Sequence, residues 1–386
     1  MRGSQLLQGR SSLLKLLLVI IGVSGASIDR AAVVGRHAVR FANPRPQVGG
    51  AEYCTPNATS SAFSQLTVGN GDFAFTADLT GLQSLNRSYG SSPDFAFPAL
   101  TQSSWGWHTP DPKRIDPTMP SPWLPDGSLN ITYAQYPVES LDEREGHGNR
   151  SIPILLDCQK HNDPRLCQWW YNFPVRTSLG QLGFVTQQQT QAGSRQTGAV
   201  PLVLEDVRDS SQHHDLYSAT LYSNWTVGEH RVVVTTVADD ETTDSVASQF
   251  TAPSGMALTV QLAFCAPGTV PEGTHTDGNV TAIGNGGMQA CDWLQPSDSH
   301  TTTQVSSSGG RLDLSRKLEY DEYSVSCVAS VGEWQRTGPH AFVLTLPPAT
   351  ESMDHTRTIS VACRYALGCC VGSESTNNLP LRVVDE

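Results

Sequence analysis

The residues best suited to chemistry in this sequence are aromatic and polar side chains between positions 70 and 108. Trp105, Trp107 and His108 fall close together in a segment rich in Pro, Ser, Asp and Gly. An indole packs its face on apolar surfaces and hydrogen-bonds through its edge, which suits sugar rings. The same residues could equally anchor the loop that carries them. Asn70, in a Gly-Asn-Gly triplet, fits a turn into a strand, which we favour over a hydrogen bond to a sugar hydroxyl.

No catalytic constellation accompanies these residues. A glycosidase needs two carboxylates about 5–9.5 Å apart. No acidic residue in this sequence has neighbouring residues that indicate a catalytic role. The sequence has no Gly-x-Ser-x-Gly elbow, phosphate-binding loop or dinucleotide fingerprint. The adjacent carboxylates at 239–241 lack the spacing of a calcium loop, and the cysteine spacings do not resemble a zinc site. We therefore predict no catalytic residues, no metal and no cofactor.

The bulk properties indicate a folded, secreted protein. Of 386 residues, 38% are hydrophobic and 16% charged, so a packed core is expected. The net charge of −12 argues against a nucleic-acid partner, because such binding depends on Lys and Arg at phosphates. A basic start, the apolar run 16–21 and the small residues up to Ala26 predict a signal peptide. The alternative is an uncut anchor, but we favour cleavage because the run is shorter than the roughly 20 apolar residues that a membrane span needs. No second hydrophobic stretch of that length occurs.

Two further patterns fit the secretory route. Nine cysteines in an oxidising compartment predict disulfides, and local pairs are expected for Cys158 with Cys167 and for Cys265 with Cys291. The odd number leaves at least one thiol without an internal partner. N-x-S/T sequons predict surface N-glycosylation at Asn57, Asn86, Asn130, Asn149, Asn224 and Asn279.

Period-2 alternation of apolar and polar residues, bounded by turn-forming residues, predicts an all-β fold. The region 91–149 is expected to be a long Pro/Trp-rich loop, because Pro removes ladder donors. The Ser/Thr run at 300–308 and the segment 193–197 are expected to be surface turns. The strands are expected at 73–79, 216–225, 231–237, 256–264, 323–329 and 341–346.

Several segments resemble a known family when they are taken in order. The block 67–83 (TVGNGDFAFTADLTGLQ) resembles the opening strands of secreted six-hairpin glycosidases, and its Gly-Asn-Gly is similar to the start of the maltose and trehalose phosphorylase group. The segments 104–108, 169–184 and 336–344 resemble later elements of the same architecture. The resemblance implies a two-layer antiparallel β-supersandwich, akin to galactose mutarotase, that leads into an (α/α)6 barrel bearing the catalytic carboxylates.

The resemblance covers about residues 50–350, and no barrel follows. We therefore expect a signal peptide at 1–26, a linker at 27–49, the β-supersandwich at 50–350 and a divergent tail at 351–386, truncated or mis-spliced. Cys363, Cys369 and Cys370 would be isolated in that tail.

This organisation predicts the non-catalytic N-terminal part of a secreted glycoside hydrolase-like protein, with carbohydrate as its partner. At Asn70, Trp105, Trp107 and His108 the contact would be with sugar or with the missing barrel. A face exposed by that missing barrel would favour self-association. The alternatives are a stand-alone carbohydrate-binding protein and a secreted structural or interaction protein with no sugar role.

Overall fold

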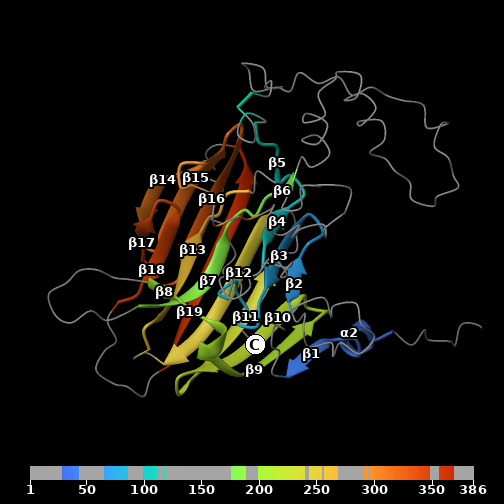
Figure 1. Cartoon of the computed structure of the whole chain (residues 1–386). Helices are drawn as coiled ribbons and strands as arrows, with labels where there is room; N and C mark the ends of the chain where they lie inside the picture. Colours follow the sequence, from blue (N-terminus) through green and yellow to red (C-terminus); the bar gives the residue numbers. More distant parts are fainter. Residues whose placement is uncertain are drawn as a thin grey trace, which may run out of the picture.

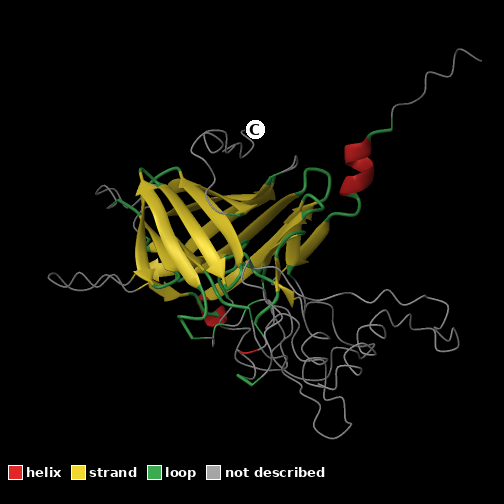
Figure 2. Ribbon diagram, turned by 90° about the horizontal axis from the view of Figure 1, so that it is seen from above, coloured by secondary structure: helices red, strands yellow, loops and turns green. Residues whose placement is uncertain are grey.

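The protein folds as a β-sandwich, which confirms the predicted all-β class (Figures 1 and 2). The computed structural model describes residues 28–42, 65–85, 99–111, 113, 117–118, 175–187, 199–239, 243–253, 256–267, 291, 293, 296–347 and 356–368. The helical elements within these ranges include α2 (Arg30–Gly35) and the 3-10 turn η5 (Leu204–Asp206). Figure 2 shows α2 standing outside the sheets. None of the described helices has the length and apolar character needed to cross a membrane.

One layer is a nine-stranded antiparallel sheet in the order β1-β9-β10-β11-β12-β19-β16-β15-β14. Its inner face is apolar and its outer face polar, because side chains alternate along a strand. In that order the strands are Val39–Ala42, Val207–Asp215, Thr220–Val227, His230–Ala238, Asp244–Pro253, Thr356–Leu367, Asp321–Ala329, Arg311–Leu318 and Thr301–Ser308.

The facing layer consists of smaller antiparallel sheets. The five-stranded sheet has the order β17 (Glu333–Gly338), β18 (Ala341–Thr345), β13 (Leu258–Ala263), β7 (Gln181–Gln187) and β8 (Ala199–Pro201). The three-stranded sheet contains β2 (Leu66–Gly69), β3 (Phe73–Ala77) and β4 (Thr101–Ser103). A two-stranded sheet pairs β5 (Trp107–His108) with β6 (Val175–Arg176).

Aromatic side chains join the two layers. The ring of Phe184 on β7 meets Trp225 on β10 at 5.4 Å and Phe250 on β12 at 5.1 Å, both edge to face. On β3, Phe73 stacks on Tyr365 of β19 at 5.8 Å. These rings are buried in a single core that draws residues from both layers. Burying each one contributes about 1.5–3 kcal/mol, so inter-layer packing is a main source of stability.

A buried connection at Asp78–Leu85, which we call the interlayer loop, passes between the layers. Its backbone carbonyls accept hydrogen bonds from the nine-stranded sheet, where Trp225 Nε1 reaches Thr80 and Thr236 Oγ1 reaches Gly81. On its other side, the Gln83 N–H donates to the carbonyl of Leu182 on β7 at 2.8 Å. Because the loop is buried, its polar groups need partners within the protein, and both layers supply them.

Asp78 organises the interlayer loop from within. Its carboxylate accepts hydrogen bonds from the Thr80 N–H and Oγ1 and from the Leu85 N–H, at 2.6–2.8 Å. Complete burial raises the pKa of Asp78 to about 6, although these hydrogen bonds act in the opposite direction. The carboxylate therefore fixes the bend of the loop, although burying its negative charge is unfavourable.

Two expected boundaries of the domain are wrong. The linker predicted at 27–49 contains α2 and β1, and β1 pairs with β9 at the edge of the nine-stranded sheet, as Figure 1 shows. The tail predicted from 351 contains β19, which pairs with both β12 and β16 inside that sheet. Cys363 on β19 is not isolated but forms a disulfide with Cys327 on β16. The alternating side chains Ile359, Val361, Cys363 and Tyr365 face the core, which explains why β19 belongs to the sheet.

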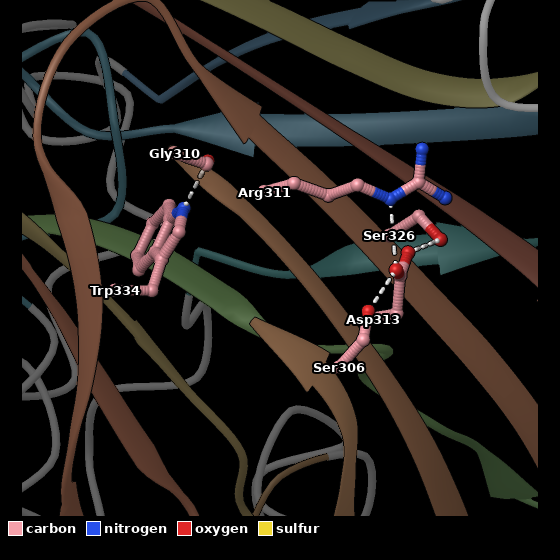
Figure 3. A network of polar contacts seen from close by, with 6 residues as sticks. All are labelled: Ser306, Gly310, Arg311, Asp313, Ser326 and Trp334. Atoms are coloured by element: carbon pink, nitrogen blue, oxygen red, sulfur yellow. Dashed lines mark hydrogen bonds and ion pairs between the residues drawn. The ribbon is translucent and has the colours of Figure 1, made fainter. Parts of the chain in front are cut away.

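The predicted turn at 300–308 is also wrong, because Thr301–Ser308 forms the edge strand β14. All of its residues except Thr302 are exposed, so the sequence shows no apolar alternation there. Hydrogen bonding holds β14 instead. The strand pairs antiparallel with β15, and Asp313 on β15 accepts from Ser306 of β14 as well as from Arg311 and Ser326 (Figure 3). Burial raises the pKa of Asp313, but these donors outweigh that effect and lower it below its ordinary value.

Three smaller expectations also need comment. The strand predicted at 216–225 begins only at Thr220, because 216–219 form the turn before it. The predicted loop at 91–149 contains the short strands β4 and β5. The turn predicted at 193–197 lies outside the described residues.

Candidate functional site

Four segments distant in sequence meet at one end of the sandwich. The chain leaves β4 at Ser103, turns through 104–106 and enters β5, which pairs with β6 (Figure 1). Strands β12 and β16 begin at the same end, with Asp244 and Asp321 as their first residues. We call this end, with Ser103, Trp105, Trp107, His108, Arg176, Asp244 and Asp321, the Trp107 edge.

Trp105 is an anchor of the Trp107 edge. Its indole Nε1 donates to the carboxylate of Asp244, which also accepts from Ser103 Oγ at 2.6 Å. Its ring is half-buried and lies 6.0 Å from that of Tyr323. A carboxylate that accepts two such hydrogen bonds fixes the turn after β4 onto the start of β12. This geometry fits the anchoring alternative for Trp105 rather than a free sugar-binding ring.

His108 also faces inward. It is only 2% exposed, and its Nδ1 lies 2.7 Å from Oδ2 of Asp321. An imidazole held by a carboxylate is one part of a nucleophilic triad, but a base must reach the proton that it removes. The buried ring of His108 is instead placed to position β5 against the start of β16.

Trp107 faces solvent at this end, with 43% of its surface exposed. Its indole Nε1 donates to the carbonyl of Ser104 at 3.0 Å, and the guanidinium of Arg176 lies 4.1 Å from its ring centroid. Arg176 is held in turn, because its Nη1 donates to the carbonyl of Ser103 at 2.6 Å. The result is an exposed ring that is fixed in orientation beside an exposed cationic donor.

Asn70 lies in the turn between β2 and β3. Its Oδ1 accepts from the backbone N–H groups of Asp72 and Phe73, at 3.1 and 2.8 Å, and its Nδ2 reaches the Thr243 carbonyl at 3.4 Å. Gly69 beside it has no room for a side chain, since a Cβ would lie 2.3 Å from the Phe73 carbonyl oxygen. These bonds are those of an Asx turn, the use that the sequence favours.

The predicted modification sites are mostly outside the described residues, as are the signal peptide, Cys158 and Cys167. Cys265 and Cys291 are joined by a disulfide. Among the sequon asparagines, Asn224 is described; it lies on β10, half-buried, with Oδ1 shielded from solvent. Glycosylation at Asn57, Asn86, Asn130, Asn149, Asn224 and Asn279 stays a prediction.

Sequence reasoning did not identify Arg176, Asp244 and Asp321 as partners of the aromatic residues. Each lies far along the chain from the residue that it contacts, and each is an ordinary charged residue at the end of a strand. Only the pairing of β5 with β6 and the register of the large sheet bring them together. Within the described part of the chain, no cluster of three or more metal-ligating side chains is present.

Comparisons with known proteins add little to this geometry. No family model and no curated protein matches the sequence. Among solved structures, the chain is similar to a protein described as a kojibiose phosphorylase from the human microbiome, at 10% identity and a TM-score of 0.32, over 51% of this chain and 23% of that one. It is also similar to a polysaccharide lyase, at 9% identity and a TM-score of 0.24, over 50% and 26%. The chain thus matches about a quarter of these structures, and TM-scores below 0.5 carry no functional information.

Proposed function

We propose that this chain is a non-catalytic β-sandwich of a secreted, glycoside hydrolase-like protein, and that it contacts carbohydrate through Trp107. The observation that carries the proposal is an indole that is 43% exposed and yet held by Arg176 and by the Ser104 carbonyl. The two disulfides are consistent with an oxidising, secretory compartment.

The physical argument rests on preorganisation. Immobilising a flexible side chain on binding costs roughly 0.5–1.5 kcal/mol, and Trp107 is already held by contacts on its edge and ring. A pyranose can therefore pack its C–H face on the indole without first ordering it. The exposed guanidinium of Arg176 supplies donors for the sugar hydroxyls.

The two carboxylates of the Trp107 edge do not support a hydrolytic function. Asp244 accepts hydrogen bonds from Ser103 and Trp105, and Asp321 is paired with His108. Both are therefore committed to holding the turn after β4 and the start of β16. Binding, rather than bond cleavage, is the chemistry that these contacts support.

The test is a glycan array probed with the full chain expressed through a eukaryotic secretory pathway. Wild type should bind a defined subset of glycans, and Trp107→Ala should lose that signal. Tyr217→Ala is the matched control, because Tyr217 is an exposed aromatic residue, 57% exposed, in the turn before β10. Equal signal from wild type and Trp107→Ala would refute the role of Trp107. A blank array with folded protein would favour the alternative of a structural or interaction protein.

A further inference from the structure

The described residues line a hollow on the outer face of the five-stranded sheet. Its volume is about 150 Å³, and we call it the Gln261 pocket. Strands β7, β13 and β18 form its floor, and the end of the interlayer loop forms one wall. The lining residues used in the argument are Gln83, Gly183, Gln261, Ala263, Trp293 and Ala341.

Small residues produce the hollow. Along β13, Thr259, Gln261 and Ala263 point away from the core, since Leu258, Val260 and Leu262 face inward. Gln261 and Ala263 line the pocket. The neighbouring strand places Gly183 opposite Gln261. A Cβ at Gly183 would lie 2.6 Å from the carbonyl oxygen of Gln83, so close packing of the interlayer loop requires glycine here. That requirement leaves the floor of the pocket open.

The wall formed by Gln83 is rigid. Its Nε2 donates to the Thr76 carbonyl and to Thr101 Oγ1, and its Oε1 accepts from the Leu182 N–H at 3.2 Å. Both ends of the amide are thus used within the protein, and Gln83 is buried. A ligand in the pocket would meet a fixed surface on this side.

Two lining side chains offer contacts to a ligand. The amide of Gln261 makes no hydrogen bond within the described part of the chain, so it can both donate and accept. The indole of Trp293 is 46% exposed. Among the described residues that line the pocket there is no Asp, Glu, Lys, Arg or His. This lining disfavours a charged ligand, because the described residues supply no counter-charge.

We infer that the Gln261 pocket binds a single neutral sugar ring, as a monosaccharide or as the end unit of a glycan. The pocket's volume of about 150 Å³ is well above the roughly 10–15 Å³ that a cavity needs to hold one water, and it is smaller than the ≈300–1,000 Å³ of a drug-sized site. An uncharged amide and an aromatic ring are the polar and apolar contacts that a pyranose requires. The site shares no residue with the Trp107 edge, so it is independent of the proposed function.

The experiment is saturation-transfer NMR on the full secreted chain with neutral monosaccharides (glucose, galactose, mannose and rhamnose) and with glucuronate. At least one neutral sugar should give a saturable signal that exceeds the glucuronate signal. Gln261→Met keeps the side-chain length but removes the amide, and Trp293→Ala removes the ring; each should weaken binding at least tenfold. Gln335→Met, an exposed residue on β17 of the same sheet, is the matched control and should bind like wild type.

Thermal unfolding of each variant shows whether it folds, so loss of binding by a folded variant is informative. The inference is overturned if no neutral sugar binds, if glucuronate binds as well as the neutral sugars, or if Gln261→Met and Trp293→Ala bind like wild type. Trp107→Ala distinguishes the two sites. Retained monosaccharide binding by this variant supports the Gln261 pocket, whereas its complete loss assigns the signal to the Trp107 edge and overturns the pocket.

Discussion

Replacing Gly81 by alanine tests the role of the interlayer loop. The backbone at Gly81 has φ +84°, and a Cβ there would lie 2.9 Å from both Cβ and Oγ of Ser223 and 3.0 Å from Val234. Overpacking in a dense core costs about 1–3 kcal/mol, and a left-handed backbone adds about 1–2 kcal/mol for a residue with a Cβ. Gly81→Ala should therefore destabilise the fold by roughly 2–5 kcal/mol, the sum of these two contributions.

The matched control is Gly71→Ala. Gly71 also has a positive φ, of +102°, but no atom lies within 4 Å of its Cβ position. Its replacement should cost only the backbone contribution of about 1–2 kcal/mol. Each kcal/mol lowers the Tm by roughly 2–4 °C in a domain of this size, so circular dichroism melts resolve the difference. Equal Tm values for the two variants would refute tight packing between the loop and the nine-stranded sheet.

Three further predictions follow from contacts at the sheets and the Trp107 edge. Replacing both Cys327 and Cys363 by alanine opens a 36-residue loop and should cost roughly 3–4 kcal/mol in denaturant unfolding; an unchanged midpoint would contradict the bond. Burial, with nearby cations, lowers the pKa of His340, so its contribution to stability is complete above its unfolded pKa near 6.5 and is lost as pH falls below it. The Tm advantage of wild type over His340→Gln should shrink between pH 7.5 and 5, and a constant advantage would refute this. Asp244→Asn should weaken the hydrogen bond from Trp105 and cost about 1–2 kcal/mol in urea, whereas wild-type stability would contradict an anchoring role.

Much of the sandwich could be predicted from apolar alternation. The strands β3, β11, β13, β16 and β18 follow the segments in which apolar residues alternate or β-branched residues run together. Their inner faces fill the core. Burial therefore requires an apolar residue at every second position, and this alternation can be recognised in the sequence.

Other strands carry weaker patterns. Edge strand β14 is held by backbone pairing with β15 and by the hydrogen bond from Ser306 to Asp313 rather than by burial, so its Ser/Thr run shows no alternation. Strand β19 alternates on its inner face, but its outer face carries small or apolar residues such as Ala362 and Ala366 as well as polar ones. Its place between β12 and β16 depends on pairings across the chain that no local pattern reveals.

The candidate sites are even harder to predict, because their residues come together only through contacts between distant segments. Trp107 could be proposed from its residue type and surroundings, but its partner Arg176 comes from a segment joined only by the β5–β6 pairing. Trp105 and His108 have equally suitable side chains, and only the structure shows that they face Asp244 and Asp321. The Gln261 pocket arises from Gly, Ala and Gln residues that carry no chemical signal in sequence.

The most direct test of the central claim is to observe the Trp107 indole while a sugar binds. The chain contains eight tryptophans, and their indole N–H resonances can be followed by two-dimensional ¹⁵N–¹H NMR, with Trp107→Phe assigning the resonance of interest. On titration with the best glycan from the array, the Trp107 resonance should shift progressively and saturate. A Trp107 resonance that stays fixed while the glycan demonstrably binds would contradict the claim that this ring carries the contact.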